Sequence, residues 1–154
     1  MAQADAWLCD LGSAGYIALG QREILQVSND LNRHELALAP AYLKHIVFWQ
    51  NRPLAVMNLG LRLGMNATAT HCLAIIAYFD PARQTHQFAA LDLARPPEKI
   101  KVDDGWASQD IASIWLNLVR SGFSWQQQSI PIIDLTKLFT MPQKLPQLKL
   151  VDCS

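Results

Sequence analysis

The sequence lacks the cysteine spacings that mark disulfide-rich and zinc-binding proteins. Its three cysteines, Cys9, Cys72 and Cys153, are odd in number and far apart, and no Cys-x-x-Cys pair occurs. Disulfide frameworks and zinc sites both need regular pairs at short spacing. We therefore expect reduced thiols, as in a cytoplasmic protein.

An excess of one charge is also missing, because 13 basic side chains balance 13 acidic ones. Proteins that bind nucleic acid usually attract phosphates through a basic field, so we expect no nucleic-acid partner. There is no apolar run of the roughly 18 residues that a membrane-spanning helix needs, and no secretory leader is recognisable. We expect a cytoplasmic location without direct membrane insertion.

Groupings of catalytic or metal-binding residues are absent as well. The histidines show no helical pairing, and the sequence contains no glycine-rich phosphate loop and no nucleophile elbow. The pair at residues 71 and 72 would point to opposite faces of a strand. We expect no catalytic residue, no metal and no cofactor, and therefore no enzyme. The histidines concerned are His34, His45, His71 and His86.

The chain does have abundant short apolar segments separated by turn residues. Of its 154 residues, 51% are hydrophobic and 17% charged, which is typical of a folded domain with a sizeable core. Ala6–Leu11 and Gly15–Leu19 flank a glycine turn and predict a hairpin. Cys72–Tyr78 and Gln87–Leu93 predict a second hairpin. The composition and pattern indicate a mainly β protein with short helices.

Other segments give weaker signals. Residues 21–27 favour a strand, residues 28–37 a loop, and residues 98–105 a charged, exposed stretch. A helix is predicted from Ser108 to Arg120, because Ser108 can cap it and Gly122 can end it. Residues 141–154 predict a frayed tail.

The segment from Phe48 to Leu59 occurs twice. An offset of 76 residues places it on Ser124–Leu135, and the match runs without a gap. Trp49 falls on Trp125, and both are interpreted as packed side chains whose indole N–H groups are bonded nearby. Two copies of this length favour two similar subdomains rather than a repeat array.

The order of these motifs resembles the CheW-like domain of bacterial chemotaxis coupling proteins. The residues that carry the resemblance are Gly15–Leu19, Arg22–Leu25, Pro40, Leu54–Leu59 and Ile130–Leu135. It covers roughly residues 6 to 140. The resemblance implies one domain over residues 1–154, built from two SH3-like five-stranded β-barrel subdomains that share a hydrophobic core. We expect these at about residues 15–65 and 71–140, with exchange of strands between them allowed.

The resemblance also implies a function without catalysis. Proteins of this kind act as adaptors that join the regulatory domain of a CheA-type histidine kinase to the cytoplasmic tips of chemoreceptors, and relatives act in pilus-motility pathways. The chain would then work at membrane-associated receptor arrays. The expected partner-binding residues are Arg22, Glu23, Leu25, Gln50 and Asn51.

The chain departs from the family pattern at the turn before its first repeated strand. Family members carry Asn-Leu-Arg-Gly where this chain has Phe48–Asn51. Asn51 can replace the glycine's backbone conformation, but Gln50 cannot replace the arginine's charge. Asn58 stands where an aspartate is expected. These changes favour a divergent adaptor; the alternatives are a small ligand-binding β-barrel or a structural subunit that assembles with itself.

Overall fold

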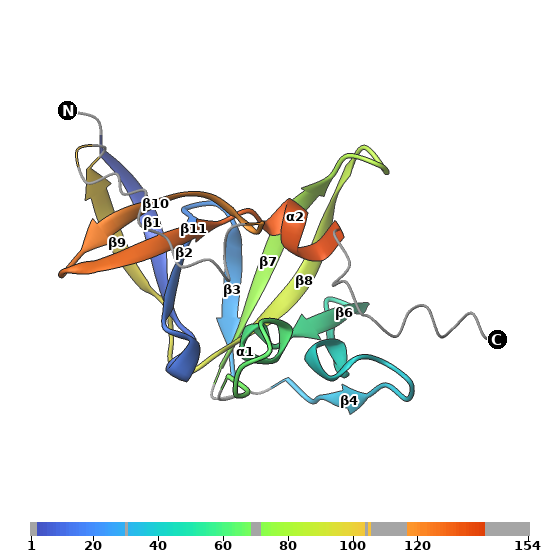
Figure 1. Cartoon of the computed structure of the whole chain (residues 1–154). Helices are drawn as coiled ribbons and strands as arrows, with labels where there is room; N and C mark the ends of the chain where they lie inside the picture. Colours follow the sequence, from blue (N-terminus) through green and yellow to red (C-terminus); the bar gives the residue numbers. More distant parts are fainter. Residues whose placement is uncertain (1–2, 30, 69–71, 104, 106–116, 141–154) are drawn as a thin grey trace.

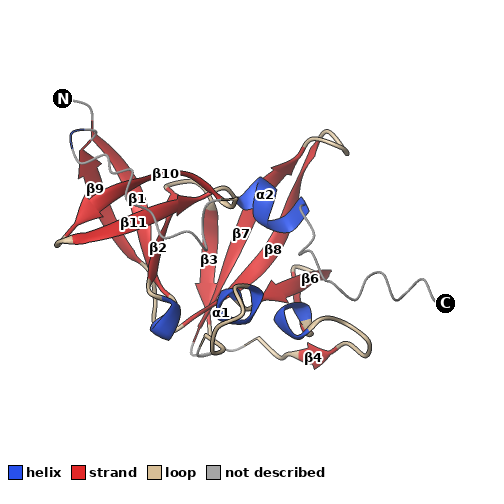
Figure 2. Cartoon of the chain, in the orientation of Figure 1, coloured by secondary structure: helices blue, strands red, loops and turns tan. Residues whose placement is uncertain are grey.

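The computed structural model describes residues 3–29, 31–68, 72–103, 105 and 117–140, and strands dominate it (Figures 1 and 2). Two short α-helices accompany the strands, α1 (Leu59–Arg62) and α2 (Leu135–Thr140), together with two 3-10 turns at Gly12–Ala14 and Ala41–Leu43. The strands are β1 (Gln3–Asp10), β2 (Tyr16–Gly20), β3 (Ile24–Ser28), β4 (His34–Glu35), β5 (His45–Trp49), β6 (Arg52–Met57), β7 (Cys72–Asp80), β8 (Thr85–Leu93), β9 (Glu98–Asp103), β10 (Val119–Trp125) and β11 (Gln128–Ile133).

The strands form two sheets with matching strand order. The first sheet runs β10-β11-β2-β1-β9, and the second runs β3-β7-β8-β6-β5-β4. Read in the direction β5-β6-β8-β7-β3, the second sheet matches the first strand by strand, so that β5 corresponds to β10 and β3 to β9. The two-residue strand β4 is an addition at the edge next to β5. In each sheet a hairpin is joined to another hairpin by one parallel contact, β11 with β2 and β6 with β8. The predicted mainly β fold with two β subdomains is confirmed.

Each sheet takes strands from both of the segments expected as subdomains, residues 15–65 and 71–140. Strands β7 and β8 follow the expected boundary, yet they lie in the sheet of β3–β6; strands β1 and β2 lie with β9–β11. Each repeat unit therefore gives its first hairpin to the other unit's sheet. The hairpin β1–β2 pairs along its two edges with β9 and β11 of the second unit. The hairpin β7–β8 pairs in the same way with β3 and β6 of the first unit.

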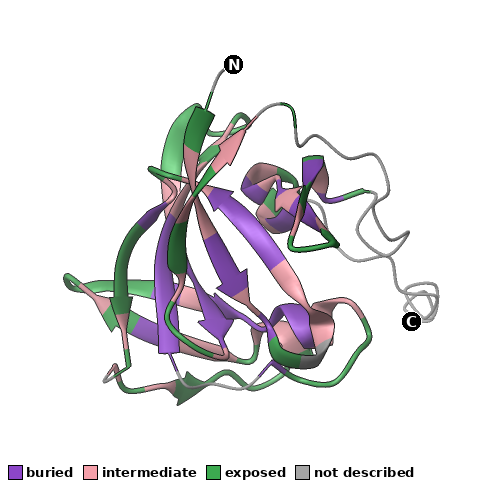
Figure 3. Cartoon of the chain, turned by 90° about the vertical axis from the view of Figure 1, so that its left-hand side faces the viewer, coloured by how far each residue is buried: buried purple, intermediate pink, exposed green. Residues whose placement is uncertain are grey.

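A shared hydrophobic core joins the two subdomains. It contains side chains from both sheets, such as Ile17 and Leu19 of β2 and Ile76 and Leu91 of β7 and β8, all fully buried. Each sheet also encloses a smaller cluster of its own, around Phe123 in the first sheet and in the second around residues of β5 to β8. Figure 3 shows the buried strands at the centre of the molecule.

The second sheet curls so that its separated strands meet. Strands β3 and β5 have three strands between them in the sheet order. Even so, Trp49 Nε1 at the end of β5 donates a hydrogen bond to Gln26 Oε1 of β3 over 2.9 Å. This contact across the curl is what places the candidate interaction residues near one another.

The sequence repeat is a structural repeat. The hairpins β5–β6 and β10–β11 are each followed by a short helix. The backbone N–H of Asn58 donates to Tyr42 O, and that of Asp134 donates to Leu118 O, at 2.9 and 2.8 Å. Both members of the second pair lie 76 residues after their counterparts. The two halves therefore share backbone contacts as well as sequence pattern.

Three weaker predictions have different outcomes. The charged stretch expected at residues 98–105 is largely a strand, β9, because its backbone pairs with β1. The expected helix does not reach Arg120, since β10 begins at Val119 and pairs with β11. Residues 108–116 of that prediction lie outside the described residues, as does the predicted tail. In the described part of the chain, no helix is both long and apolar enough to cross a membrane.

Candidate interaction surface

Glu23 holds the turn between β2 and β3. Its Oε1 accepts a hydrogen bond from Gly20 N at 2.7 Å, and its Oε2 lies 3.1 Å from Arg120 Nη2 of β10. Its backbone oxygen accepts from Ala77 N of β7 at 3.0 Å. One residue therefore links both sheets. Both oxygens of the Glu23 carboxylate already have partners within the chain.

The neighbouring predicted residues are more accessible. Arg22 is exposed in the same turn. Leu25 follows on β3 with 45% of its surface exposed, at a register shift between Ile24 and Gln26. Val27 is 38% exposed on the same strand. β3 also lies at the edge of its sheet, where a partner can reach both apolar side chains.

Gln50 and Asn51 form the tip of the β5–β6 hairpin. Both are exposed, and both have left-handed backbone conformations, with φ of 50° and 62°. This is the geometry of the tight hairpin turns in which asparagine and glycine are favoured. Asn51 therefore takes the conformation expected of it in place of glycine. The bond from Trp49 to Gln26 lays this tip beside the part of β3 that carries Leu25.

An aromatic and cationic group lies next to this tip, and the sequence pattern does not indicate it. The guanidinium of Arg52 lies over the ring of Phe88, 4.9 Å from its centroid, and Trp49 lies 5.8 Å from the same ring. Arg52 is exposed. It provides a positive charge two residues after the position at which Gln50 replaces the family's arginine. Only the pairing of β6 with β8 brings these residues together, and no local pattern indicates it.

We name the exposed residues of this region the β3–hairpin surface, defined as Arg22, Leu25, Val27, Gln50, Asn51 and Arg52. It combines two apolar side chains with cationic and amide groups. Such a composition suits recognition of a protein surface.

Asn58 belongs to a buried polar network. Its side-chain N–H groups donate to Thr68 O at 3.0 Å and to Asp92 Oδ2 at 3.1 Å, while its oxygen accepts from Thr68 N at 2.8 Å. Asp92 also pairs with Arg33 at 2.5 Å and is only 2% exposed. An aspartate at position 58 would face the Asp92 carboxylate, whereas the amide bridges it. The departure at Asn58 thus has a structural reason and removes no surface group.

The described cysteines are chemically quiet. Burial, with a smaller contribution from Cys72, raises the pKa of the Cys9 thiol to about 12. Burial also raises the pKa of Cys72. Thiols of this kind are poor nucleophiles at neutral pH. Within the described ranges, no three or more His, Cys, Asp or Glu side chains are grouped so as to hold a metal ion.

Comparison with known proteins gives a structural likeness. No protein-family model matches the sequence, and no curated protein matches it either. The scaffolding protein TtCheW from Thermoanaerobacter tengcongensis has a similar crystal structure, with a TM-score of 0.76 at 18% sequence identity. The likeness covers 93% of this chain and 97% of TtCheW. With the exchanged hairpins and shared core described above, it shows that this chain has a CheW-like fold.

Proposed function

We propose that this chain is a non-enzymatic adaptor. It would couple the regulatory domain of a CheA-type histidine kinase to the cytoplasmic tips of chemoreceptors, or serve a related pilus-motility signalling complex. The observation that supports this most is the likeness to a scaffolding protein over nearly the whole of both chains. The adaptor would act in the cytoplasm, at receptor arrays on the membrane.

The β3–hairpin surface is the proposed contact site. Leu25 would be its apolar anchor, because an exposed leucine on an edge strand gains most from removal from water. Arg52 and Arg22 would meet acidic groups of the partner, and the amides of Gln50 and Asn51 would exchange hydrogen bonds with its backbone. Glu23, which already has partners in the chain, would support this surface without contacting the partner.

Binding to a kinase regulatory domain and to a receptor tip fragment from the same genome tests the contact site. The variant Leu25→Asp should weaken binding to the kinase domain or to the receptor tip by a factor of about ten or more, since it places a charge within the proposed interface. Biolayer interferometry measures this. The matched control is Met65→Asp, which changes another apolar residue, 36% exposed and outside this surface.

The two results have clear meanings. Both variants should melt within a few degrees of the wild type, because both side chains are exposed. Equal binding by Leu25→Asp and Met65→Asp would reject the β3–hairpin surface. Failure of the wild-type chain to bind either protein would reject the adaptor function itself.

A further inference from the structure

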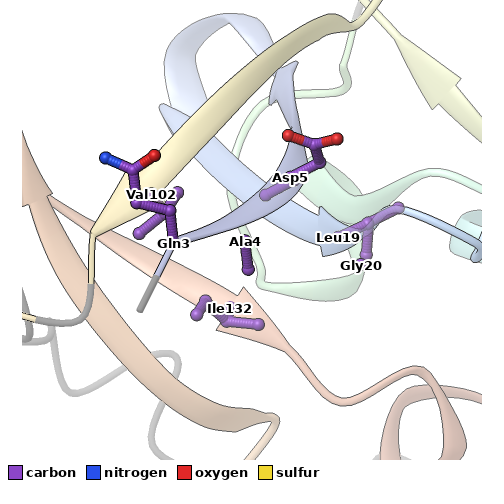
Figure 4. Close-up of a pocket in the computed structure, with 8 residues that line it drawn as sticks. Gln3, Ala4, Asp5, Leu19, Gly20, Val102 and Ile132 are labelled. Carbon is purple, nitrogen blue, oxygen red and sulfur yellow. The ribbon is translucent and has the colours of Figure 1, made fainter. Parts of the chain in front are cut away.

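The first sheet has a cavity at each end, and the two cavities differ in chemistry. One, of about 310 Å³, lies where β1 begins and β2 ends, and Figure 4 shows Ala4 and Ile132 turned toward each other across it. The carboxylate of Asp5 and the amide of Gln3 point away from this space (Figure 4), so few polar groups remain there to orient a ligand. The other cavity, of about 140 Å³, lies at the opposite ends of the same strands.

We name the smaller cavity the Trp125 site. Asp10 comes two residues after the buried Leu8 on β1, so both side chains face the inside of the sheet. Tyr16 is paired with Asp10 and Glu98 with Leu8, and paired residues share a face. Trp125 packs against the cluster that contains Leu8. Aromatic rings and carboxylates therefore converge at this end of the sheet. The lining that concerns us consists of Asp10, Tyr16, Arg95, Glu98, Trp125 and Gln128.

The second sheet contains a counterpart of this site. The sequence repeat places Trp49 and Arg52 at the positions of Trp125 and Gln128, 76 residues earlier. Both pairs lie at the ends of equivalent hairpins, β5–β6 and β10–β11.

The strand pairing extends the correspondence to the aromatic residue opposite. Ala18 and Ala90 are equivalent, because each takes part in the parallel contact of its own sheet. Two residues before them lie Tyr16 and Phe88, which are thus counterparts. 

The same register identifies the polar residue on the neighbouring strand. Leu8 and Ile75 are the antiparallel partners of those two alanines. On their other side they pair with Glu98 and Gln26, respectively. Glu98 in the first sheet therefore corresponds to Gln26 in the second.

In the second sheet a guanidinium occupies this end. The Arg52 guanidinium lies over the Phe88 ring, 4.9 Å from its centroid, and the Trp49 ring lies 5.8 Å from the same centroid. The indole N–H of Trp49 is bonded to Gln26. The chain's own side chains thus complete this end of the second sheet.

The first sheet keeps the two aromatic rings but lacks that guanidinium, because Gln128 stands at the position of Arg52. It also carries a carboxylate, Glu98, where the second sheet has an amide. In the part of the chain that the structure describes, the indole N–H of Trp125 has no hydrogen-bond partner and the Glu98 carboxylate has no ion-pair partner. The bonded indole expected for both tryptophans is therefore found only for Trp49 within the described ranges.

The charges of the Trp125 site favour a cation. Arg95 Nε lies 2.9 Å from Asp10 Oδ2, so these two charges offset each other. The charge of Glu98 remains, next to the faces of two aromatic rings. Cations bind to the faces of tryptophan and tyrosine rings.

We propose that the Trp125 site binds a guanidinium group from outside the chain, stacked on the aromatic rings and paired with Glu98. A guanidinium is planar, so it can stack on a ring and donate two parallel hydrogen bonds to one carboxylate. The volume of about 140 Å³ is below the roughly 300 Å³ at which sites for whole drug-sized ligands begin. The site therefore receives one functional group rather than a cofactor. This inference does not depend on the proposed adaptor function.

A nuclear magnetic resonance titration of the whole ¹⁵N-labelled chain at neutral pH tests the proposal. The first probe is methylguanidinium, for which we expect a Kd of about 1 mM, since so few atoms make contact. The indole N–H signal of Trp125 should shift, whereas that of Trp49 should not, because Gln26 already binds it. Trp125→Phe and Trp49→Phe identify the two signals.

Two capped glycine pentapeptides, one with a central arginine and one with a central lysine, give the source of the group. Tighter binding of the arginine peptide than of methylguanidinium would support the proposal and assign the group to an arginine residue of a polypeptide. Equal or weaker binding of that peptide would support it with a free small compound as the source. The lysine peptide should bind about tenfold more weakly than the arginine peptide, because an ammonium neither stacks nor forms paired bonds.

Three variants at exposed positions test the residues. Glu98→Gln should weaken binding of methylguanidinium about tenfold or more, since it removes the charge. Gln128→Arg should abolish binding, because it supplies the chain's own guanidinium in the manner of Arg52. Glu35→Gln is the matched control, a glutamate of β4 outside this site, and it should bind like the wild type. All three should melt within a few degrees of the wild type.

Four results would overturn the proposal. The Trp125 signal could stay unchanged up to about 50 mM methylguanidinium, far above the expected Kd. Glu98→Gln could bind as well as Glu35→Gln, folded Gln128→Arg could still bind the probe, or the lysine peptide could bind as tightly as the arginine peptide.

Discussion

Asn58 is fixed by hydrogen bonds to Thr68 and Asp92, and all three residues are buried. The amide supplies donors to two acceptors and accepts a bond itself. A carboxylate cannot make those donations at neutral pH. This residue therefore explains why a family aspartate can be absent here without any loss at the protein surface.

The variant Asn58→Asp should lower the free energy of unfolding by roughly 3 kcal/mol at pH 7, because it places two carboxylates in one buried site. A proton held between them relieves the repulsion. The folded variant thus binds a proton more tightly than the unfolded chain, so its deficit should shrink as the pH falls toward about 4. Urea unfolding at several pH values measures this deficit.

Asn58→Ala is the control for that experiment. It removes the same hydrogen bonds without adding a charge, so its deficit should change less with pH. Equal pH dependence in the two variants would contradict the arrangement of Asn58 beside Asp92.

Cys9 should make stability fall in alkaline solution. Its pKa is raised from the usual 9.0 to about 12 in the folded protein. The folded state then holds the proton when the unfolded state has lost it. This contribution is complete below pH 9 and is lost as the pH rises from 9 toward 12, by up to about 1.4 kcal/mol per pH unit.

The comparison needs the variant Cys9→Ala, which stays apolar but does not titrate. Guanidinium unfolding between pH 8 and 10.5 should show the wild type losing stability faster than the variant. Parallel curves would mean that the thiol is less buried than the structure indicates.

At the scale of elements, the two repeated hairpins share a strained turn. Gln50 and Asn51 occupy left-handed conformations in one, and Gln126 and Gln127 do so in the other, with φ of 49° and 66°. Asparagine tolerates this conformation better than glutamine does. The second hairpin therefore carries more backbone strain than the first.

Gln127→Gly should raise the free energy of unfolding by about 1 kcal/mol, because glycine adopts a positive φ without strain. Thermal and urea unfolding both report the change. Gln128→Gly is the matched control: residue 128 begins strand β11, where glycine should lower stability. A loss of stability in Gln127→Gly would show that the turn has another geometry.

Local patterns were sufficient to predict the hairpins and their turns. Cys72–Tyr78 and Gln87–Leu93 paired as predicted because an apolar run, a Pro-containing turn and a second run are adjacent in sequence. The strand β9 was missed because its side chains are largely charged and none is buried; its backbone pairing with β1, at least 90 residues away, defines it.

The candidate site was predictable only in part. Leu25, Gln50 and Asn51 are exposed, as a contact surface requires, whereas Glu23 has its partners inside the chain. Arg52 could not have been singled out from sequence, since its place over Phe88 depends on a parallel strand contact between distant segments. Burial of one face is visible in a sequence, but the neighbour across a sheet is not.

At the scale of the whole molecule, the exchange of hairpins makes the two subdomains one folding unit. The first sheet is built from both ends of the described chain, and the second from the middle. Arg120 and Glu23 connect them by an ion pair, and Thr136 of α2 donates a hydrogen bond to Phe79 O of β7 at 2.7 Å. The strands of the β3–hairpin surface belong to the second sheet, and the ion pair of Glu23 with Arg120 ties the adjoining β2–β3 turn to the first.

The adaptor function requires that both partners bind at once. The direct measurement is size-exclusion chromatography with light scattering on a kinase regulatory domain and a receptor tip fragment, with and without this chain. The two partners should co-elute in one complex only when the chain is present, and Leu25→Asp should reduce that complex. Binding of only one partner at a time, or of neither, would rule out an adaptor function.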